Sequence, residues 1–394
     1  MQLPDAAGLI ATLGQAGVHV GLVSTGGGSA AIAHLLTTPG AGDVVLEALV
    51  PYARAAVDRL LGGLQESYCS SRTARRLAAA GWDRAAAVAP ADPTRPPRLV
   101  GAAVTAGLRT RQPKRGAHRA VAAAQTLAAT IVGALELDKG ARSRGAEELV
   151  AAALLLDVMM EAADCGWQRG HAVTSLLRPG ERVVWDRCDP PTAWRELMAG
   201  GRASVPVGDL PADATPVPGM LVFPGSFDPL HDGHRLMARI AAEVAERPVD
   251  HELSLSNVEK PPLDYLEIRD RAAQFAGRRL WLTRAATFLE KLDVFPEATF
   301  VVGADTYVRL ADPRFYGGSA AAAAAAVEAI ATRSRGLVVF GRVRDGEFQE
   351  ASRLPVPERL REVSYFVSRR EFRLDVSSTQ LRCEARARAA GAEG

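Results

Sequence analysis

The stretch LVFPGSFDPLHDGH at residues 221–234 decides how the second half of the chain folds. Its first residues, Leu221 to Phe223, form an apolar strand pattern, and an amphipathic helix pattern runs from His234 to Ala245. Between them, Gly225 lets the backbone approach a ligand closely, and the turn from strand to helix presents free N–H groups and the helix dipole to an anion. The stretch therefore predicts a phosphate-binding turn at the start of a helix.

Strands and helices alternate along the rest of this half. Apolar strand patterns lie near Glu252–Leu255, Thr299–Val302 and Leu337–Phe340, and a helix pattern covers Tyr265–Phe275. The seven alanines at 320–326 favour a further helix. Such alternation is typical of a parallel sheet covered on both faces, so we expect an α/β domain with a Rossmann-like, doubly wound parallel sheet.

Two histidines, His231 and His234, lie three residues apart in the first turn of the predicted helix. Side chains at this spacing lie on the same face of a helix, so both rings can face one anion, and Gly233 keeps the space between them clear. An imidazole titrates near neutrality and can both donate hydrogen bonds to phosphate and add positive charge as a leaving group departs. The alternative is a pair of solvated histidines at a helix N-terminus.

The order Gly-Ser-Phe-Asp-Pro followed by His-x-Gly-His resembles the nucleotidylyltransferase superfamily. Two later stretches, 303–305 (Gly-Ala-Asp) and 377–382 (Ser-Ser-Thr-Gln-Leu-Arg), are similar to the G-x-D and S-S-T-x-[IL]-R motifs of the same superfamily. The resemblance implies that His231, His234 and Arg382 are catalytic. It also implies nucleotide contacts from Gly225, Ser226, Phe227, Gly303, Asp305, Ser378 and Thr379.

Each later motif also has a purely structural interpretation. Serine and threonine commonly cap helices, so Ser378 and Thr379 could be caps alone. Asp305 could likewise cap a helix at Tyr307 instead of binding ribose hydroxyls.

The stretch 254–263 resembles the acceptor loop of nicotinamide and nicotinate mononucleotide adenylyltransferases. This resemblance implies acceptor contacts from Asn257 and Lys260; the alternative for Lys260 is a solvated lysine. The tryptophan that bacterial members often carry soon after G-x-D is absent. The sequence therefore does not decide which aromatic side chain stacks on the acceptor; the candidates are Trp281, Phe315 and Tyr316.

We therefore expect adenylyl transfer from ATP to nicotinamide or nicotinate mononucleotide, yielding NAD or its deamido form and pyrophosphate. Magnesium is expected to be carried by the ATP phosphates. The sequence leaves two alternatives open. One is a nucleotidylyltransferase for another phosphorylated acceptor or for CTP, and the other is an inactive nucleotide-binding sensor.

Length and composition limit the domain organisation, the partners and the location of the protein. A chain of 394 residues predicts two domains, and we place them at 1–199 and 219–385, with a Pro- and Gly-rich linker at 200–218 and a tail at 386–394. A net charge of +2 gives no global attraction to nucleic acid or membranes. Four widely spaced cysteines and the lack of a long apolar run predict a reduced, cytoplasmic protein, and the sequence leaves monomer and homo-oligomer open.

The first half also shows α/β patterns. A strand is predicted at Val18–Val23, directly before a Gly-rich turn at 26–28, and another at Leu99–Thr105. Helices are predicted at 3–13, Ala30–Leu36, Val44–Leu61, Ala120–Leu135 and Glu147–Ala163.

Residues 24–28 (Ser-Thr-Gly-Gly-Gly), 37–40, Tyr52 and the arginine-led stretch 144–149 resemble the C-terminal domain of the competence-induced CinA proteins, which deamidate nicotinamide mononucleotide. The resemblance implies a three-layer α/β/α domain. The family's nucleophile position falls on Val23 and its lysine on Val57, so we expect no deamidase activity, with Ser24 and Ser29 as the alternative nucleophiles.

A basic cluster follows the second predicted strand of this half. It has two interpretations, a solvated loop or a site for nucleotide phosphate, and the lack of interleaved aromatic residues argues against nucleic acid. Its members are Arg109, Arg111, Lys114, Arg115, His118 and Arg119.

Overall fold

The computed structural model describes residues 2–90, 97–112, 114–258, 260–344 and 347–372. The chain divides into two compact units. Unit 1 comprises Met1–Arg195 together with Glu259–Glu267, and unit 2 comprises Glu196–Val258 together with the chain from Ile268 onward. The predicted two-domain α/β organisation is confirmed, although the boundaries differ from those expected.

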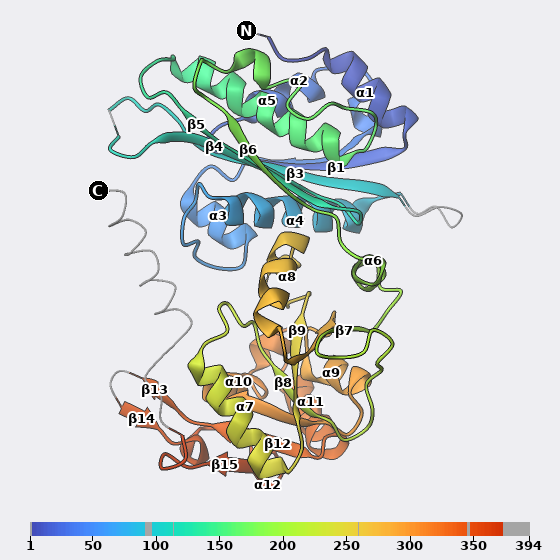
Figure 1. Ribbon diagram of the computed structural model, residues 1–394, viewed down its shortest axis with the longest axis vertical. Helices are drawn as coiled ribbons and strands as arrows, with labels where there is room; N and C mark the ends of the chain where they lie inside the picture. Colours follow the sequence, from blue (N-terminus) through green and yellow to red (C-terminus); the bar gives the residue numbers. More distant parts are fainter. Residues whose placement is uncertain (1, 91–96, 113, 259, 345–346, 373–394) are drawn as a thin grey trace. The chain divides into compact units, whose positions relative to one another are not determined.

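Within the described residues, unit 1 is built on a six-stranded mixed sheet of order β2-β1-β3-β4-β5-β6. Strand β1 pairs in parallel with β2 and β3, and β4, β5 and β6 continue the sheet as antiparallel neighbours. Helices α1, α2 and α5 cover one face and α3 and α4 the other, which confirms the expected three layers (Figure 1). The bounds are α1 Ala6–Gln15, β1 Val18–Thr25, α2 Ser29–Leu36, β2 Val45–Leu49, α3 Arg54–Leu60, α4 Ser71–Val88, β3 Arg98–Gly107, β4 His118–Gln125, β5 Thr130–Leu137, α5 Arg144–Ala162 and β6 Val183–Cys188.

Small residues allow the layers of unit 1 to pack closely. A Cβ on Gly101 of β3 would lie 2.1 Å from the Ala78 carbonyl oxygen of α4, and one on Gly21 of β1 would lie 2.2 Å from the Gly81 carbonyl oxygen. Glycine is therefore required where α4 lies directly on the strands.

Two predictions for unit 1 were wrong. Residues 120–135 form most of the hairpin of β4 and β5 instead of a helix, and 44–61 divide into β2 and α3. The alanines of β4 have high helix propensity, but the strand is buried by helices on both faces, where alternation disappears and small side chains suit close packing. Tertiary packing overrides local propensity here.

Unit 2 is built on a sheet of order β15-β12-β11-β8-β9-β10-β7. The run from β15 to β10 is parallel, and β7 is antiparallel at the edge. Numbered among themselves, the six parallel strands in the described part of this unit follow the order 3-2-1-4-5-6 of a doubly wound fold, which confirms the expected fold class. The bounds are β7 Ser204–Gly208, β8 Leu221–Pro224, α7 Asp232–Ala245, β9 Val249–Ser254, α8 Tyr265–Ala272, β10 Arg279–Thr283, α9 Phe288–Val294, β11 Thr299–Gly303, α10 Ala304–Arg309, α11 Ala320–Arg333, β12 Gly336–Phe340, β13 Arg342–Arg344, β14 Glu347–Gln349, α12 Glu358–Glu362 and β15 Ser364–Val367.

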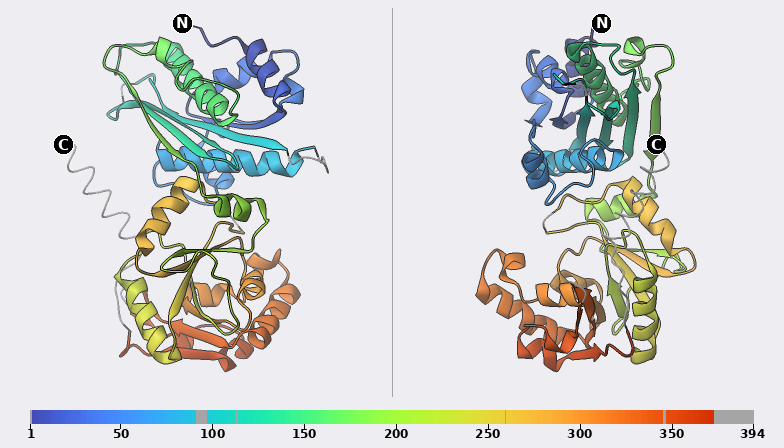
Figure 2. Two further views of the ribbon diagram at one scale, coloured as in Figure 1. Left: turned by 45° about the vertical axis from the view of Figure 1, so that its right-hand side comes forward. Right: turned by 90° about the vertical axis from the view of Figure 1, so that its left-hand side faces the viewer.

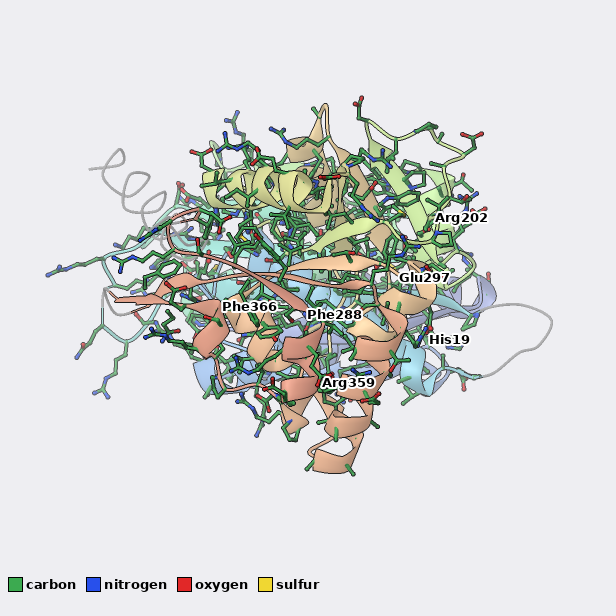
Figure 3. All side chains as sticks on the ribbon, turned by 90° about the horizontal axis from the view of Figure 1, so that it is seen from below. His19, Arg202, Phe288, Glu297, Arg359 and Phe366 are labelled. Atoms are coloured by element: carbon green, nitrogen blue, oxygen red, sulfur yellow. The ribbon has the colours of Figure 1, made fainter. Side chains whose placement is uncertain are left out.

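Both faces of this sheet are covered. Helix α7 lies against one face and α11 against the other (Figure 2). On the α11 side, Val222, Phe300 and Val339 form a core with Ile330 of α11. Phe288 and Phe366 are partly buried at the margins of this core, where Phe288 meets Phe300 edge-to-face at 5.1 Å between ring centroids (Figure 3). Burial on two sides explains why β8, β11 and β12 are almost continuously apolar, whereas β9 carries the buried polar residues 250–252.

Strand β7 overturns part of the linker prediction. Ser204–Gly208, inside the expected linker of 200–218, pairs antiparallel with β10. The Pro and Gly content that indicated a linker fits an edge strand equally well, because an edge residue such as Pro206 need not donate to a second neighbour.

A short segment of the expected second domain belongs to unit 1 instead. Tyr265 donates its amide to Thr130 Oγ1 at 2.9 Å and its hydroxyl to the Leu127 carbonyl at 3.0 Å. Arg75 pairs with the buried Asp264 at 2.7 Å. These contacts explain why residues 260–267 cluster with unit 1, and they show that the predicted continuous domain 219–385 is interrupted.

In the part of the chain that the structure describes, no helix is long and apolar enough to cross a membrane.

Candidate functional site

The turn after β8 lies at the position where the sheet changes direction. Strands β8 and β11 are parallel neighbours, and the chain leaves β8 toward β9 on one side, while β12 lies beyond β11 on the other. In open α/β sheets, ligands bind in the crevice at the carboxyl ends of such a strand pair. The fold therefore places the residues that follow β8 and β11 together at one edge.

Phe227 shapes the turn from inside. Its backbone has φ 44°, and its side chain is fully buried, edge-to-face with Phe223, His234 and Phe275. A Cβ on Gly225 would lie 2.6 Å from this ring, and the Gly225 amide already donates to the Glu252 carbonyl at 3.0 Å.

This packing revises the expected roles of the turn residues. Gly225 is glycine because the Phe227 ring lies over it, and its N–H is already used within the fold. The Phe227 side chain belongs to the core, so any nucleotide contact from it would have to come from its backbone. Ser226 is exposed and stays a predicted contact.

Two polar side chains from the end of α8 and the following turn hold the loop in place. Gln274 accepts from the Leu230 amide at 2.8 Å and donates to the Phe227 carbonyl at 3.3 Å. Arg271 donates to the Ser226 carbonyl at 2.8 Å and lies 3.5 Å from the Asp228 carboxylate. Neither residue was singled out from the sequence, because nothing in their local pattern distinguishes them from ordinary helix residues.

His231 and His234 stack at the N-terminus of α7. Their ring centroids are 3.8 Å apart and their planes differ by 24°. His231 is the N-cap, and its Nδ1 accepts the Gly233 amide at 3.1 Å, while the His231 amide donates to Nδ1 of His234 at 3.3 Å. The expectation that the two rings face the same ligand is consistent with this arrangement.

These hydrogen bonds define the tautomer. Because Nδ1 of each ring accepts a backbone N–H, the neutral ring must carry its proton on Nε2. Each histidine therefore presents an Nε2–H donor on the side away from its own backbone contact.

Burial favours the neutral form of both rings. It lowers the pKa of His234 to about 3, with further lowering from the neighbouring His231 and His251. Burial also lowers the pKa of His231, with Asp232 acting in the opposite direction. These lowered pKa values disfavour the positive charge expected from the sequence, and a bound anion would raise them again.

Gly233 is required for this stack. A Cβ at this position would lie 2.9 Å from both Cε1 and Nδ1 of His231. The prediction that Gly233 keeps space for the rings is therefore confirmed.

Gly303 and Asp305 follow β11 at the neighbouring strand end. Gly303 is the N-cap of α10, and a Cβ built there would meet no atom within 4 Å, so its surroundings are open. Asp305 does not cap the helix, which overturns that alternative; its carboxylate pairs with Arg342 of β13. A cavity of about 670 Å³ lies beside them, lined among others by Asp305, Arg309 and Arg342.

The three candidate stacking rings differ sharply. Trp281 is buried in the core and donates Nε1–H to Asp250 at 3.0 Å, so it is excluded as a stacking partner. Tyr316 donates to the Leu310 carbonyl at 2.9 Å, and Phe315 lies beneath the Arg309 guanidinium at 5.8 Å. Phe315 and Tyr316 are partly exposed and stay candidates.

The structure does not test several of the predicted site residues. Ser378, Thr379 and Arg382 lie outside the described residues. Asn257 and Lys260 are exposed, and Lys260 belongs to the segment that clusters with unit 1, so their acceptor contacts stay predictions. Within the described ranges, no group of three or more His, Cys, Asp or Glu side chains is placed to hold a metal ion.

The two positions that the CinA resemblance assigns to the nucleophile and the lysine are hydrophobic. Val23 and Val57 are both buried. Of the alternative nucleophiles, Ser24 is buried and donates to the Gly27 carbonyl at 2.9 Å, whereas Ser29 is exposed and donates to Glu148 at 3.1 Å. Ser24 is thus committed to the turn, and the absence of deamidase activity stays a prediction.

Comparison with known proteins gives limited matches. No family model matches the chain, and no curated protein matches it. Among solved structures, it is similar to the competence/damage inducible protein CihA from Agrobacterium tumefaciens, with 20% identity over 40% of this chain and 92% of that one and a TM-score of 0.32. It is also similar to a CinA superfamily protein from Escherichia coli, with 17% identity over 41% of this chain and 94% of that one and a TM-score of 0.30. Likenesses this low carry no statement about activity.

Proposed function

We propose that unit 2 transfers the adenylyl group of ATP to nicotinamide or nicotinate mononucleotide, releasing pyrophosphate. The observation that carries the proposal is the stacked pair of His231 and His234 at the start of a 14-residue helix, at the direction change of a doubly wound sheet. Helix N-termini and Nε2–H donors both favour phosphate oxygens.

The chemistry needs alignment and charge stabilisation more than a nucleophilic side chain. A 5′-phosphate oxygen of the acceptor attacks the α-phosphorus of ATP in line, the bond between that phosphorus and the bridging oxygen breaks, and pyrophosphate leaves with the electron pair. No covalent enzyme intermediate forms. Magnesium enters as part of the MgATP substrate, bound to its phosphate oxygens.

The two imidazoles stabilise the departing charge. Before binding, both rings are neutral, so they act as Nε2–H donors aimed at phosphate oxygens. The approach of a polyanion raises their pKa, and proton uptake then adds positive charge where the leaving group develops its negative charge. The same coupling predicts that MgATP binding takes up protons near pH 6.

Other residues are assigned by the motif resemblance. Asp305 is proposed to bind ribose hydroxyls, a role in which Arg342 would hold its carboxylate in place. Ser378, Thr379 and Arg382 are proposed to grip the triphosphate, and Asn257 and Lys260 the acceptor. We assign Gln274 and Arg271 as positioning residues, because they contact the loop that leads into α7.

The direct test is an assay of the full chain with MgATP and a panel of phosphorylated acceptors, measuring pyrophosphate and the dinucleotide product. We expect His234→Ala to lower kcat by about 100-fold or more, since it removes a donor to the developing charge. Arg239→Ala is the matched control: this exposed residue lies on the same helix more than one turn further on, and its loss should leave turnover unchanged.

The outcomes separate the alternatives. Pyrophosphate release with another acceptor, or with CTP in place of ATP, would retain the reaction class and change the substrate. If MgATP binds but no acceptor leads to pyrophosphate release, the protein is a nucleotide-binding sensor and not a transferase.

A further inference from the structure

Two loops of unit 1 and the start of strand β4 meet at one edge of its sheet. Strands β3 and β5 both run antiparallel to β4, so the ends of β3 and β5 lie beside the start of β4. Residues 109–111 follow β3, His118 begins β4, and residues 139–144 connect β5 to α5. A cavity of about 920 Å³ opens between these loops.

The lining of this cavity is strongly cationic. Its side chains include five Lys or Arg residues and one histidine, and no Asp or Glu residue of the described chain lines it. These residues are Arg109, Arg111, His118, Lys139, Arg142 and Arg144. A chain with a net charge of only +2 therefore concentrates positive charge in one concave place.

Carboxylates behind the lining fix part of this cluster. Glu181 accepts both ends of the Arg142 guanidinium, at 2.5 and 2.6 Å. Glu147 is fully buried, lies 2.6 Å from His118 Nδ1 and accepts the Arg109 amide at 2.6 Å. These contacts hold the loops in a defined geometry, so the cavity is a built site and not a set of freely moving side chains.

Three lining cations keep their charge uncompensated. Within the described residues, Arg109, Arg111 and Lys139 form no ion pair; Arg109 and Lys139 donate only to the carbonyls of Arg142 and Arg115. Placing like charges together without counter-charges is unfavourable, and an anion in the cavity would relieve the repulsion.

We propose that this cavity binds an oligophosphate anion. Guanidinium forks match phosphate oxygens in pairs, and a chain of phosphates is the small-anion class whose charge matches three uncompensated cations. The site lies outside the phosphate turn of unit 2 and does not depend on the proposed transferase reaction. Its lining also excludes the Gly-rich turn at 26–28.

The ligand is a small anion and not a nucleic acid strand. Strand-binding surfaces combine a long positive groove with aromatic platforms, and the described lining of this cavity contains no aromatic residue other than His118. Free oligophosphate and a nucleoside triphosphate both carry the linked phosphates that the site would recognise, so both are included in the test.

The experiment measures binding of inorganic triphosphate by calorimetry to the full chain carrying His231→Asn and His234→Asn, which disables the site in unit 2. We expect one equivalent to bind. Adding Arg109→Gln and Arg111→Gln should weaken binding about 100-fold, because each charge-assisted hydrogen bond contributes about tenfold or more. The matched control, Arg59→Gln with Arg115→Gln, removes two exposed charges that do not line the cavity and should leave affinity unchanged.

Each outcome of the binding experiment supports or overturns the proposal. ATP binding tighter than triphosphate would identify a nucleotide ligand, and equal affinities would identify recognition of the phosphates alone; both support the proposal. It is overturned if no stoichiometric binding occurs, if the control pair weakens binding as much as the Arg109 and Arg111 pair, or if a single-stranded oligonucleotide binds more tightly than either anion. None of these outcomes depends on transferase activity.

Discussion

His234 is half-buried between the second histidine and the Phe227 ring, and this position makes it a pH-sensitive residue. Its pKa is lowered to about 3 in the folded protein from an ordinary value of 6.5. Between these values the unfolded chain binds a proton that the folded protein does not. The free energy of unfolding therefore falls as the pH drops from about 6.5 toward 3, and the contribution is absent above this window.

Replacing His234 by glutamine should make the acid destabilisation shallower. One proton contributes at most about 1.4 kcal/mol per pH unit, so the unfolding free energies of variant and parent should converge or cross below pH 6. Urea melts between pH 7 and 4.5 provide the measurement. Identical slopes for both proteins would contradict the burial assigned to this ring.

A substitution at Gly233 should affect activity and stability differently. In Gly233→Ala, the added Cβ collides with the His231 ring, which must leave its stacked position. Alanine is favoured over glycine in helices by about 1 kcal/mol, so the melting temperature should hold or rise while turnover falls at least about tenfold. Gly145→Ala in α5 is the control, since its Cβ meets nothing and activity should not change. Unchanged turnover in Gly233→Ala would argue against a role for the stack.

At the level of elements, the phosphate turn depends on a neighbouring helical turn. Gln274 bonds to both ends of residues 227–230, so Gln274→Met removes two hydrogen bonds at once. We expect the free energy of unfolding to fall by about 1–2 kcal/mol and kcat to fall with it, because the start of α7 loses its anchor. Gln274→Glu, which keeps the acceptor for Leu230, should recover part of the loss in both measurements.

The packing of α4 on the sheet of unit 1 is another element-level constraint. Gly101→Ala would drive a Cβ into the α4 backbone, which cannot yield as a side chain can. We expect a loss of about 3 kcal/mol or more in chemical denaturation, near the upper end for single substitutions. Gly116→Ala, with open space around it, should be close to neutral, and a similar effect at both positions would show that the contact is not rigid.

For the whole molecule, the two units should respond separately to ligands. In the Arg109→Gln/Arg111→Gln chain, MgATP at a hundredfold excess over Kd should stabilise the binding unit by about 2.7 kcal/mol. Hydrogen exchange should then slow in β8, β11 and β12 but not in β1 and β3. In the parent chain, additional protection near residues 107–118 and 139–146 would reflect the second anion site. Protection spread evenly over both sheets would contradict independent binding.

The sequence alone determined the doubly wound unit, because its strands are buried on both faces and are separated by clear helix patterns. It also determined the histidine pair, since spacing within one helical turn is a local property. It failed where long-range packing decides the state of the chain. The alanine-rich stretch 120–135 favours a helix locally but becomes a hairpin between two helical layers, and Ser204–Gly208 becomes a strand because β10 offers it an edge.

Only the tertiary structure decided the chemical state of the site and the surroundings of its residues. The lowered pKa of His234 depends on its burial and on His251 of the neighbouring strand β9. The anchors Arg271 and Gln274 and the partner of Asp305, Arg342, are likewise distant in sequence from the residues that they contact. The cationic cavity of unit 1 likewise forms because antiparallel pairing brings two loops and the start of β4 to one edge. A sequence pattern encodes neighbours along the chain, whereas desolvation and charge depend on neighbours in space.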